Sequence, residues 1–203
     1  IFFEGFPPTV VRSQVVALAA WLAREKIVLL DVLSVACTPE LYRSSLEQLP
    51  GVREVLSDAN PDVEVSLVRG KRPVMPGAGM WNRHVLRRHL SRRAGRYGLV
   101  HARTDYAASI AAPVLRGQSM DLVWDCRGDA AAEFELRTEN TSMPAVLRKA
   151  RSRSIADQGA HAARACRHAI FVSTPLRDQW APRLAGTPHV IPTVADDTVF
   201  FFD

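Results

Sequence analysis

Short runs of β-branched and other apolar residues alternate along this chain with longer segments in which apolar residues recur at helical spacing. This alternation is typical of βαβ units and a mainly parallel sheet. The apolar runs predict strands at Ile1–Phe3, Ile27–Val35, Val63–Val68, Leu99–Ala102, Leu122–Asp125, Ala169–Ser173 and His189–Ile191. The segments between them predict helices at Ser13–Arg24, Pro39–Gln48, Trp81–Arg96, Asp105–Arg116, Pro144–Arg167 and Thr174–Ala185. We therefore expect an α/β fold, a Rossmann-like three-layer domain.

Residues with special backbone preferences mark the ends of these helices. Thr38 and Ser173 or Thr174 precede predicted helices and have a side-chain oxygen that can cap one. Gly51, Gly117 and Gly186 follow predicted helices and suit the turn that ends one.

The composition fits a globular domain. The 203 residues are 47% hydrophobic, which is enough for a sizeable core. The longest apolar run, 15–23, is far shorter than the roughly 20 residues that a membrane-spanning helix needs. The chain enters a strand-like run at Ile1, so we expect no signal peptide, and a few leading residues to be missing. Cys37, Cys126 and Cys166 have no paired spacing, which favours neither disulfides nor a zinc site and fits a reducing cytoplasm.

Positive charge is concentrated in one part of the chain. The formal net charge is +5, yet residues 65–104 contain no acidic residue and hold ten of the 26 basic ones. The predicted helix over 81–96 combines an apolar stripe with many arginines. Such a helix can lie on an anionic membrane surface, or it can pack on the sheet with a solvated charged side. A basic chain could also bind nucleic acid, but we find no reading helix or aromatic platform.

Two predicted strand ends hold the strongest candidate site residues, because ligands in parallel α/β folds bind beyond the carboxyl ends of strands. Asp125, Arg127 and Gly128 follow one buried strand. Asp125 could accept a sugar hydroxyl and Arg127 could bind a phosphate, or the two could form an internal pair. His101 and Arg103 end another strand and could contact a ligand, although a lone histidine is often only packing. The neighbouring Asp105 is expected to cap a helix.

The first predicted helix offers a third candidate position. Arg12, Ser13 and Gln14 lie where the chain enters this helix, whose backbone N–H groups favour an anion. The alternative is that Ser13 only caps the helix and Arg12 is solvated.

Several segments together, in order, resemble the N-terminal half of family-four glycosyltransferases, retaining enzymes of the GT-B fold. They are the Pro-rich opening with its Arg-Ser-Gln-Val helix start (3–15), Val-His-Ala-Arg (100–103), Asp-Cys-Arg-Gly (125–128), the Val-Ser-containing strand and helix start (169–176), and the Ile-Pro segment (190–200). Thr193 and Ala195 depart from the family's usual Asn-Gly-Val-Asp motif.

The resemblance implies an acceptor-side domain over 1–192 and the start of an interdomain linker over 193–203. The nucleotide-sugar-binding domain would lie beyond this chain, which alone is expected to be inactive. The implied reaction moves a sugar from a nucleotide sugar to a hydroxyl acceptor, a glycan or lipid-linked saccharide, in glycan or polysaccharide biosynthesis. It needs no metal and no cofactor, and the implied location is the cytoplasm or the inner face of the membrane.

The same resemblance assigns roles to residues. Gly5 and Phe6 belong to a loop that approaches the donor phosphates, and Asp125 orients the acceptor hydroxyl. The rest of the acceptor site would be formed by Arg127, Gly128, His101, Arg103, Arg12, Ser13 and Gln14. The alternatives are a non-catalytic module that binds a glycan or nucleotide, and a basic nucleic-acid-binding protein.

Overall fold

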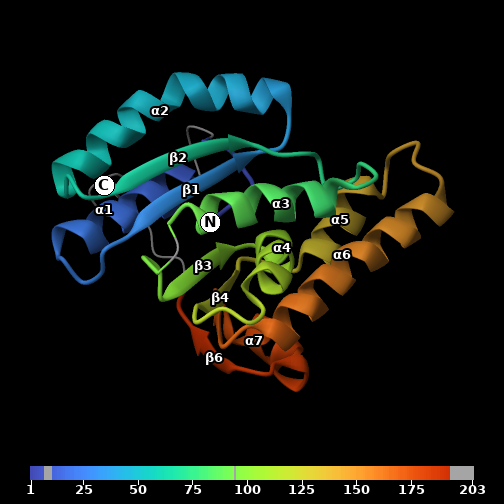
Figure 1. The fold of residues 1–203 in the computed structure, drawn as a ribbon. Coiled ribbons are helices and arrows are strands. Elements are labelled where there is room, and N and C mark those ends of the chain that lie inside the picture. Colours follow the sequence, from blue (N-terminus) through green and yellow to red (C-terminus); the bar gives the residue numbers. More distant parts are fainter. Residues whose placement is uncertain (7–10, 94, 193–203) are drawn as a thin grey trace, which may run out of the picture. The chain divides into compact units, whose positions relative to one another are not determined.

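The computed structural model describes residues 1–6, 11–93 and 95–192, which divide into two compact units, 1–85 and 86–192 (Figure 1). Each unit is built from parallel strands and helices. The predicted Rossmann-like α/β class with mainly parallel sheets is confirmed. The predicted linker at 193–203 lies outside the described residues. Among the residues that are described, no helix is both long enough and apolar enough to cross a membrane.

The first unit contains a short parallel sheet. Strands β1 (Asp31–Ala36) and β2 (Glu64–Arg69) pair in parallel, and Phe2 bridges to Ser34 on β1. The chain enters its first helix through a π-helical turn, η1 (Arg12–Val16), which continues as α1 (Ala17–Arg24). The core of this unit is apolar and includes Phe2, Phe6, Val11, Val16, Val32, Leu49, Leu56 and Val65.

Helix α2 (Pro39–Ala59) packs against both strands and runs along them in Figure 1. Thr38 caps it, as predicted, because its Oγ1 accepts a hydrogen bond from the Leu41 amide at 3.1 Å. The prediction that the helix ends at Gln48, before Pro50 and Gly51, was wrong. Ser45, Leu49 and Leu56 are buried on one face. Packing of that face offsets the helix cost of an internal proline, roughly 3 kcal/mol.

Helix α3 (Ala78–Ser91) starts in the first unit and ends in the second. Its buried residues are Ala78, Asn82, Leu86 and Leu90, spaced four apart. The sequence placed this helix at 81–96. The true start is set by Gly77, which takes a positive φ of 72° immediately before it.

The second unit is organised around a four-stranded parallel sheet in the order β3-β4-β5-β6. The strands are β3 (Leu99–Arg103), β4 (Asp121–Cys126), β5 (His168–Phe171) and β6 (Thr187–Val190). The helices are α4 (Asp105–Leu115), α5 (Ala130–Thr138), α6 (Ala145–Ala165), α7 (Thr174–Trp180) and the short η2 (Ala181–Arg183). Helix α4 contacts β3, β4 and α6, and α5 packs along α6. Helix α5 was not predicted.

Candidate ligand site at the ends of β3 and β4

The candidate site lies in the second unit, where four parallel strands end at one edge of the sheet. Strand β3 ends at Arg103 and β4 at Cys126, with Arg127 directly after it. In parallel α/β sheets this edge is the usual place for a ligand.

The register of β3 and β4 brings the predicted residues onto one face of the sheet. His101 pairs with Val123, and Arg103 pairs with Asp125. Side chains alternate between faces with a period of two, so His101, Arg103 and Asp125 share a face. The register therefore places the ends of β3 and β4 side by side.

Asp125 is at the centre of this cluster. Its Oδ2 lies 3.3 Å from Nε2 of His101 and 3.2 Å from Nε of Arg127. The Asp125 side chain is only 7% exposed, whereas those of His101 and Arg127 are 41% and 21% exposed. A buried carboxylate therefore lies behind two cationic or polar groups that reach solvent.

The second carboxylate oxygen of Asp125 is in a different situation. Oδ1 is buried, and no donor among the described residues forms a hydrogen bond with it. A buried acceptor without a donor costs about 1–3 kcal/mol, and more when it is charged, so native structures seldom leave one. A ligand hydroxyl that donates to Oδ1 would remove this cost.

The backbone next to the site is strained. Thr104, directly after β3, has φ 77° and ψ 160°, a region that is almost exclusively occupied by glycine. Its amide donates to the carbonyl oxygen of Asp125 at 2.9 Å. This bond ties the end of β3 to the residue at the centre of the site. Strained backbone of this kind is concentrated at functional sites.

The opposite face of β4 contains a buried polar cluster. Oδ1 of Asp105 accepts hydrogen bonds from Nε1 of Trp124, at 3.2 Å, and from the Cys126 thiol, at 3.7 Å. Asp105 was expected to cap α4, but the N-cap position is Thr104, which makes no side-chain cap bond, and the Asp105 carboxylate turns into the core. Burial raises the pKa of Asp105 to about 6, and its two hydrogen bonds limit the rise. Burial also raises the pKa of the Cys126 thiol.

The remaining predicted residues of this unit have distinct surroundings. Arg103 is buried, at 7% exposure, at the end of β3. The carbonyl oxygen of Gly128 lies 3.5 Å from Sγ of Cys126, as a second possible acceptor for its thiol proton, and a β-carbon at Gly128 would meet only the end of the flexible Glu133 side chain.

The predicted donor-phosphate residues belong to the first unit. Phe6 is buried in the core against Phe2, and its amide donates to the Ser45 hydroxyl at 2.8 Å. Gly5 has φ 67°, and a β-carbon there would lie 2.5 Å from that hydroxyl oxygen. These contacts explain both residues as packing, and their role at a phosphate stays a prediction.

The predicted anion site at the first helix also belongs to the first unit. Arg12, Ser13 and Gln14 are in η1, and Gln14 is half-buried. The side chains of Arg12 and Ser13 lie outside the described part of the structure, so this hypothesis also stays a prediction.

Two residues that the sequence did not single out make further contacts in the second unit. Asp129 caps α5 by accepting from the Ala131 and Ala132 amides, and its other oxygen accepts from Nε2 of Gln179 at 2.6 Å. Trp180 packs edge-on against Trp124 with ring centroids 5.3 Å apart. Asp129 was detectable as a polar residue before a helix, but its contact with Gln179 spans 50 residues. Within the described residues no group of three or more potential ligands is arranged to hold a metal ion.

Comparison with known proteins gave no assignment, since no protein-family model matches the chain and no curated protein matches it.

Proposed function

We propose that this chain is the acceptor-side domain of a retaining glycosyltransferase, which moves a sugar from a nucleotide sugar to a hydroxyl acceptor. The observation that carries the proposal is the buried Oδ1 of Asp125, an acceptor without a protein donor among the described residues, at the carboxyl end of a parallel strand. The resemblance of the sequence to family-four glycosyltransferases supports the same assignment.

In this proposal Asp125 orients the acceptor. A sugar hydroxyl would donate to Oδ1, while nitrogens of His101 and Arg127 lie within ion-pair distance of the other oxygen, Oδ2. Holding the hydroxyl in one direction favours attack by its oxygen on the donor sugar, because orientation removes part of the entropic barrier. As that oxygen attacks, the hydroxyl would give up its hydrogen bond to Oδ1 and pass its proton to the departing phosphate oxygen, so Asp125 acts by positioning and not as the base.

Arg127 has a complementary role. A guanidinium has five N–H donors in one plane, so Arg127 can face Asp125 through Nε and still bind a hydroxyl or an anionic group of the acceptor. His101 is exposed enough to contact the same ligand. The proposed site therefore suits a hydroxylated acceptor better than an apolar one.

Calorimetric titration of the purified chain, and of the protein extended through any downstream coding sequence, tests the proposal. Nucleoside diphosphates, nucleotide sugars and candidate glycan acceptors are titrated into both. We expect tight nucleotide binding and sugar transfer only in the extended protein. Full nucleotide affinity in the short chain, or no downstream domain, would instead identify a self-contained binding module.

A further inference from the structure

The loop between β2 and α3, together with the first turn of α3, has an exposed apolar cluster, here called the apolar tip. It consists of Val74, Met75, Met80 and Trp81, which are 64%, 49%, 72% and 46% exposed. Four large apolar side chains within eight consecutive residues at this exposure are costly in water, since a soluble surface usually scatters such residues singly. Packing within the first unit therefore does not explain why these apolar side chains are exposed.

The tip is held in a fixed shape. The buried side chain of Asn82 accepts from the Lys71 amide at 2.8 Å and donates to the Lys71 carbonyl at 2.9 Å. A β-carbon at Gly70 would lie 2.9 Å from that Asn82 oxygen, so only glycine lets the backbone come this close to the Asn82 side chain. Two hydrogen-bonded turns close the loop. The Met75 amide donates to the Arg72 carbonyl at 2.9 Å, and the Ala78 amide donates to the Met75 carbonyl at 3.0 Å. The apolar side chains are therefore presented by a loop and a helix start whose backbone is fixed by hydrogen bonds.

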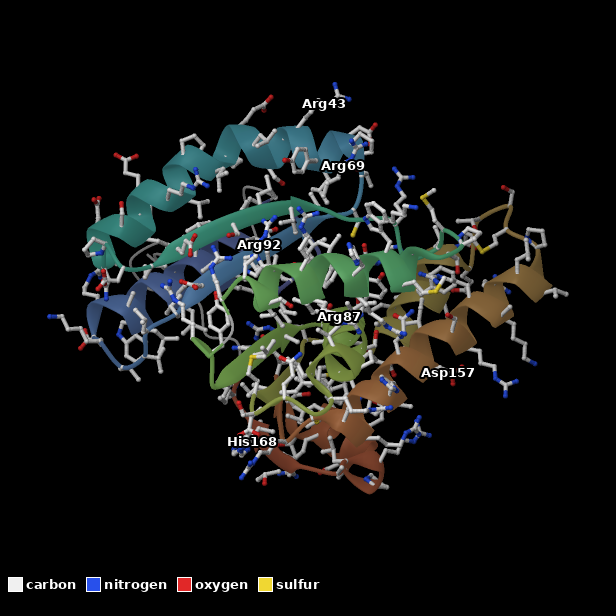
Figure 2. The ribbon with its side chains drawn as sticks, viewed as in Figure 1. Arg43, Arg69, Arg87, Arg92, Asp157 and His168 are labelled. Atoms are coloured by element: carbon white, nitrogen blue, oxygen red, sulfur yellow. The ribbon has the colours of Figure 1, made fainter. Side chains whose placement is uncertain are left out.

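Basic residues surround the apolar tip. Nζ of Lys71 lies 4.8 Å from the centroid of the Trp81 ring, and Arg69 and Arg72 are exposed beside the loop. Figure 2 labels Arg69, which ends β2 directly before this loop. The acid-free stretch 65–104 contains the whole tip, and Glu40 faces Arg72 at 4.0 Å.

We propose that the apolar tip binds the surface of an anionic lipid bilayer. Tryptophan and methionine side chains would enter the boundary between headgroups and acyl chains, while the lysine and arginines contact lipid phosphates. Amphipathic tryptophan is favoured at this depth. A nucleic acid fits less well, because three of the four apolar side chains are aliphatic and offer no stacking surface.

The inference goes beyond the proposed function and does not rest on it, because the tip lies in the first unit and the Asp125 site in the second. Binding to vesicles is measured without donor or acceptor. Failure of one proposal therefore leaves the other intact.

The test is sedimentation of the full chain with vesicles at low salt. We expect binding to equal parts phosphatidylcholine and phosphatidylglycerol, and little binding to phosphatidylcholine alone or at high salt. The double variant Met80→Ser/Trp81→Ser should bind at least about tenfold more weakly. The matched control is Val146→Ser/Leu147→Ser on α6, which removes residues that are 80% and 61% exposed beside Arg148 and Lys149, and should bind like the wild type.

Fluorescence gives a second readout that does not depend on the double variant folding. Trp124 and Trp180 are buried, so in a Trp21→Phe background Trp81 is the exposed tryptophan, and its emission should shift to the blue on mixed vesicles. No binding to mixed vesicles, no shift, or equal losses in the tip and control variants would overturn the proposal. A mixed-sequence oligonucleotide that displaces the protein from the vesicles would overturn it in favour of a nucleic-acid surface.

Discussion

Nε2 of His101 lies 3.3 Å from Oδ2 of Asp125, and it shares that oxygen with Nε of Arg127 at 3.2 Å. Two different segments, the strand β3 and the loop after β4, thus each bring a nitrogen within ion-pair distance of the same carboxylate oxygen. Its other oxygen, Oδ1, is buried without a donor among the described residues. Within the part of the chain that the structure describes, Oδ1 is thus an acceptor that a ligand could use.

Replacing Asp125 with Asn tests whether this acceptor binds substrate. The amide keeps the size of the side chain but removes the charge that strengthens a hydrogen bond from a sugar hydroxyl. We expect turnover of the extended protein to fall about 10- to 100-fold, the usual effect of losing a hydrogen bond to a charged group. The measurement is the steady-state rate of sugar transfer with a saturating donor.

Asp121→Asn is the matched control, because Asp121 begins the strand that Asp125 nearly ends. Asp121 is 43% exposed and pairs with Arg167 at 3.2 Å on the surface. Exposed pairs contribute little to stability, about 0–1 kcal/mol, so neither turnover nor melting should change. Wild-type turnover in Asp125→Asn, with Asp121→Asn also unaffected, would remove Asp125 from the site.

Thr104→Gly should stabilise the protein, contrary to the usual effect of glycine. Thr104 has φ 77°, where a β-carbon costs about 1–3 kcal/mol, and glycine loses roughly 0.5–1 kcal/mol through unfolded-state entropy. A net rise of about 1 kcal/mol in the free energy of unfolding is expected by urea denaturation. Thr104→Ala keeps the β-carbon and should bring no such gain. An equal gain with alanine would show that the threonine side chain, not the backbone, carries the strain.

Much of the architecture was predictable because it depends on local patterns. The apolar runs located the strands that became β2, β3 and β4, and the caps at Thr38 and Ser173 follow from side-chain chemistry within three residues. The proximity of His101 and Asp125 was also predictable, since parallel strands end at one edge of a sheet.

The remaining features depend on contacts between residues distant in sequence. Pro50 and Gly51 are helix-breaking by local preference, and only the buried face of α2 against the sheet keeps them helical. The strand predicted from Ile27 begins at Asp31, where pairing with Glu64 on β2 begins. Asp105 has the local environment of a cap, but the indole N–H of Trp124, 19 residues later, recruits its carboxylate into the core.

Asp105 makes a pH-dependent contribution to stability. Burial raises its pKa from 3.8 to about 6, so the native state holds this proton more tightly than the unfolded chain. Its contribution is therefore most favourable below about pH 4 and falls as pH rises through about 6, by about 3 kcal/mol in total. The Asp105→Asn variant cannot ionise and keeps an oxygen for Trp124.

The measurement is urea denaturation of the wild type and Asp105→Asn at several pH values between about 4 and 7. The difference between the two free energies of unfolding should move in favour of the variant as pH rises, because other carboxylates titrate equally in both proteins. A difference that stays constant across this range would show that Asp105 titrates normally in the folded state.

Two glycines within helices should respond to alanine with opposite signs. Gly159 on α6 faces buried Trp180, and a β-carbon there would lie 2.5 Å from Cη2 and 2.8 Å from Cζ2 of the indole ring. Overpacking of this kind costs about 1–3 kcal/mol, which exceeds the roughly 1 kcal/mol that alanine gains over glycine in a helix. Gly51 on α2 has no atom within 4 Å of the same position, so only the helix gain applies.

Urea denaturation should therefore show Gly159→Ala less stable and Gly51→Ala more stable than the wild type. Stabilisation by both would mean that Trp180 moves aside at little cost, and that its packing against α6 is loose.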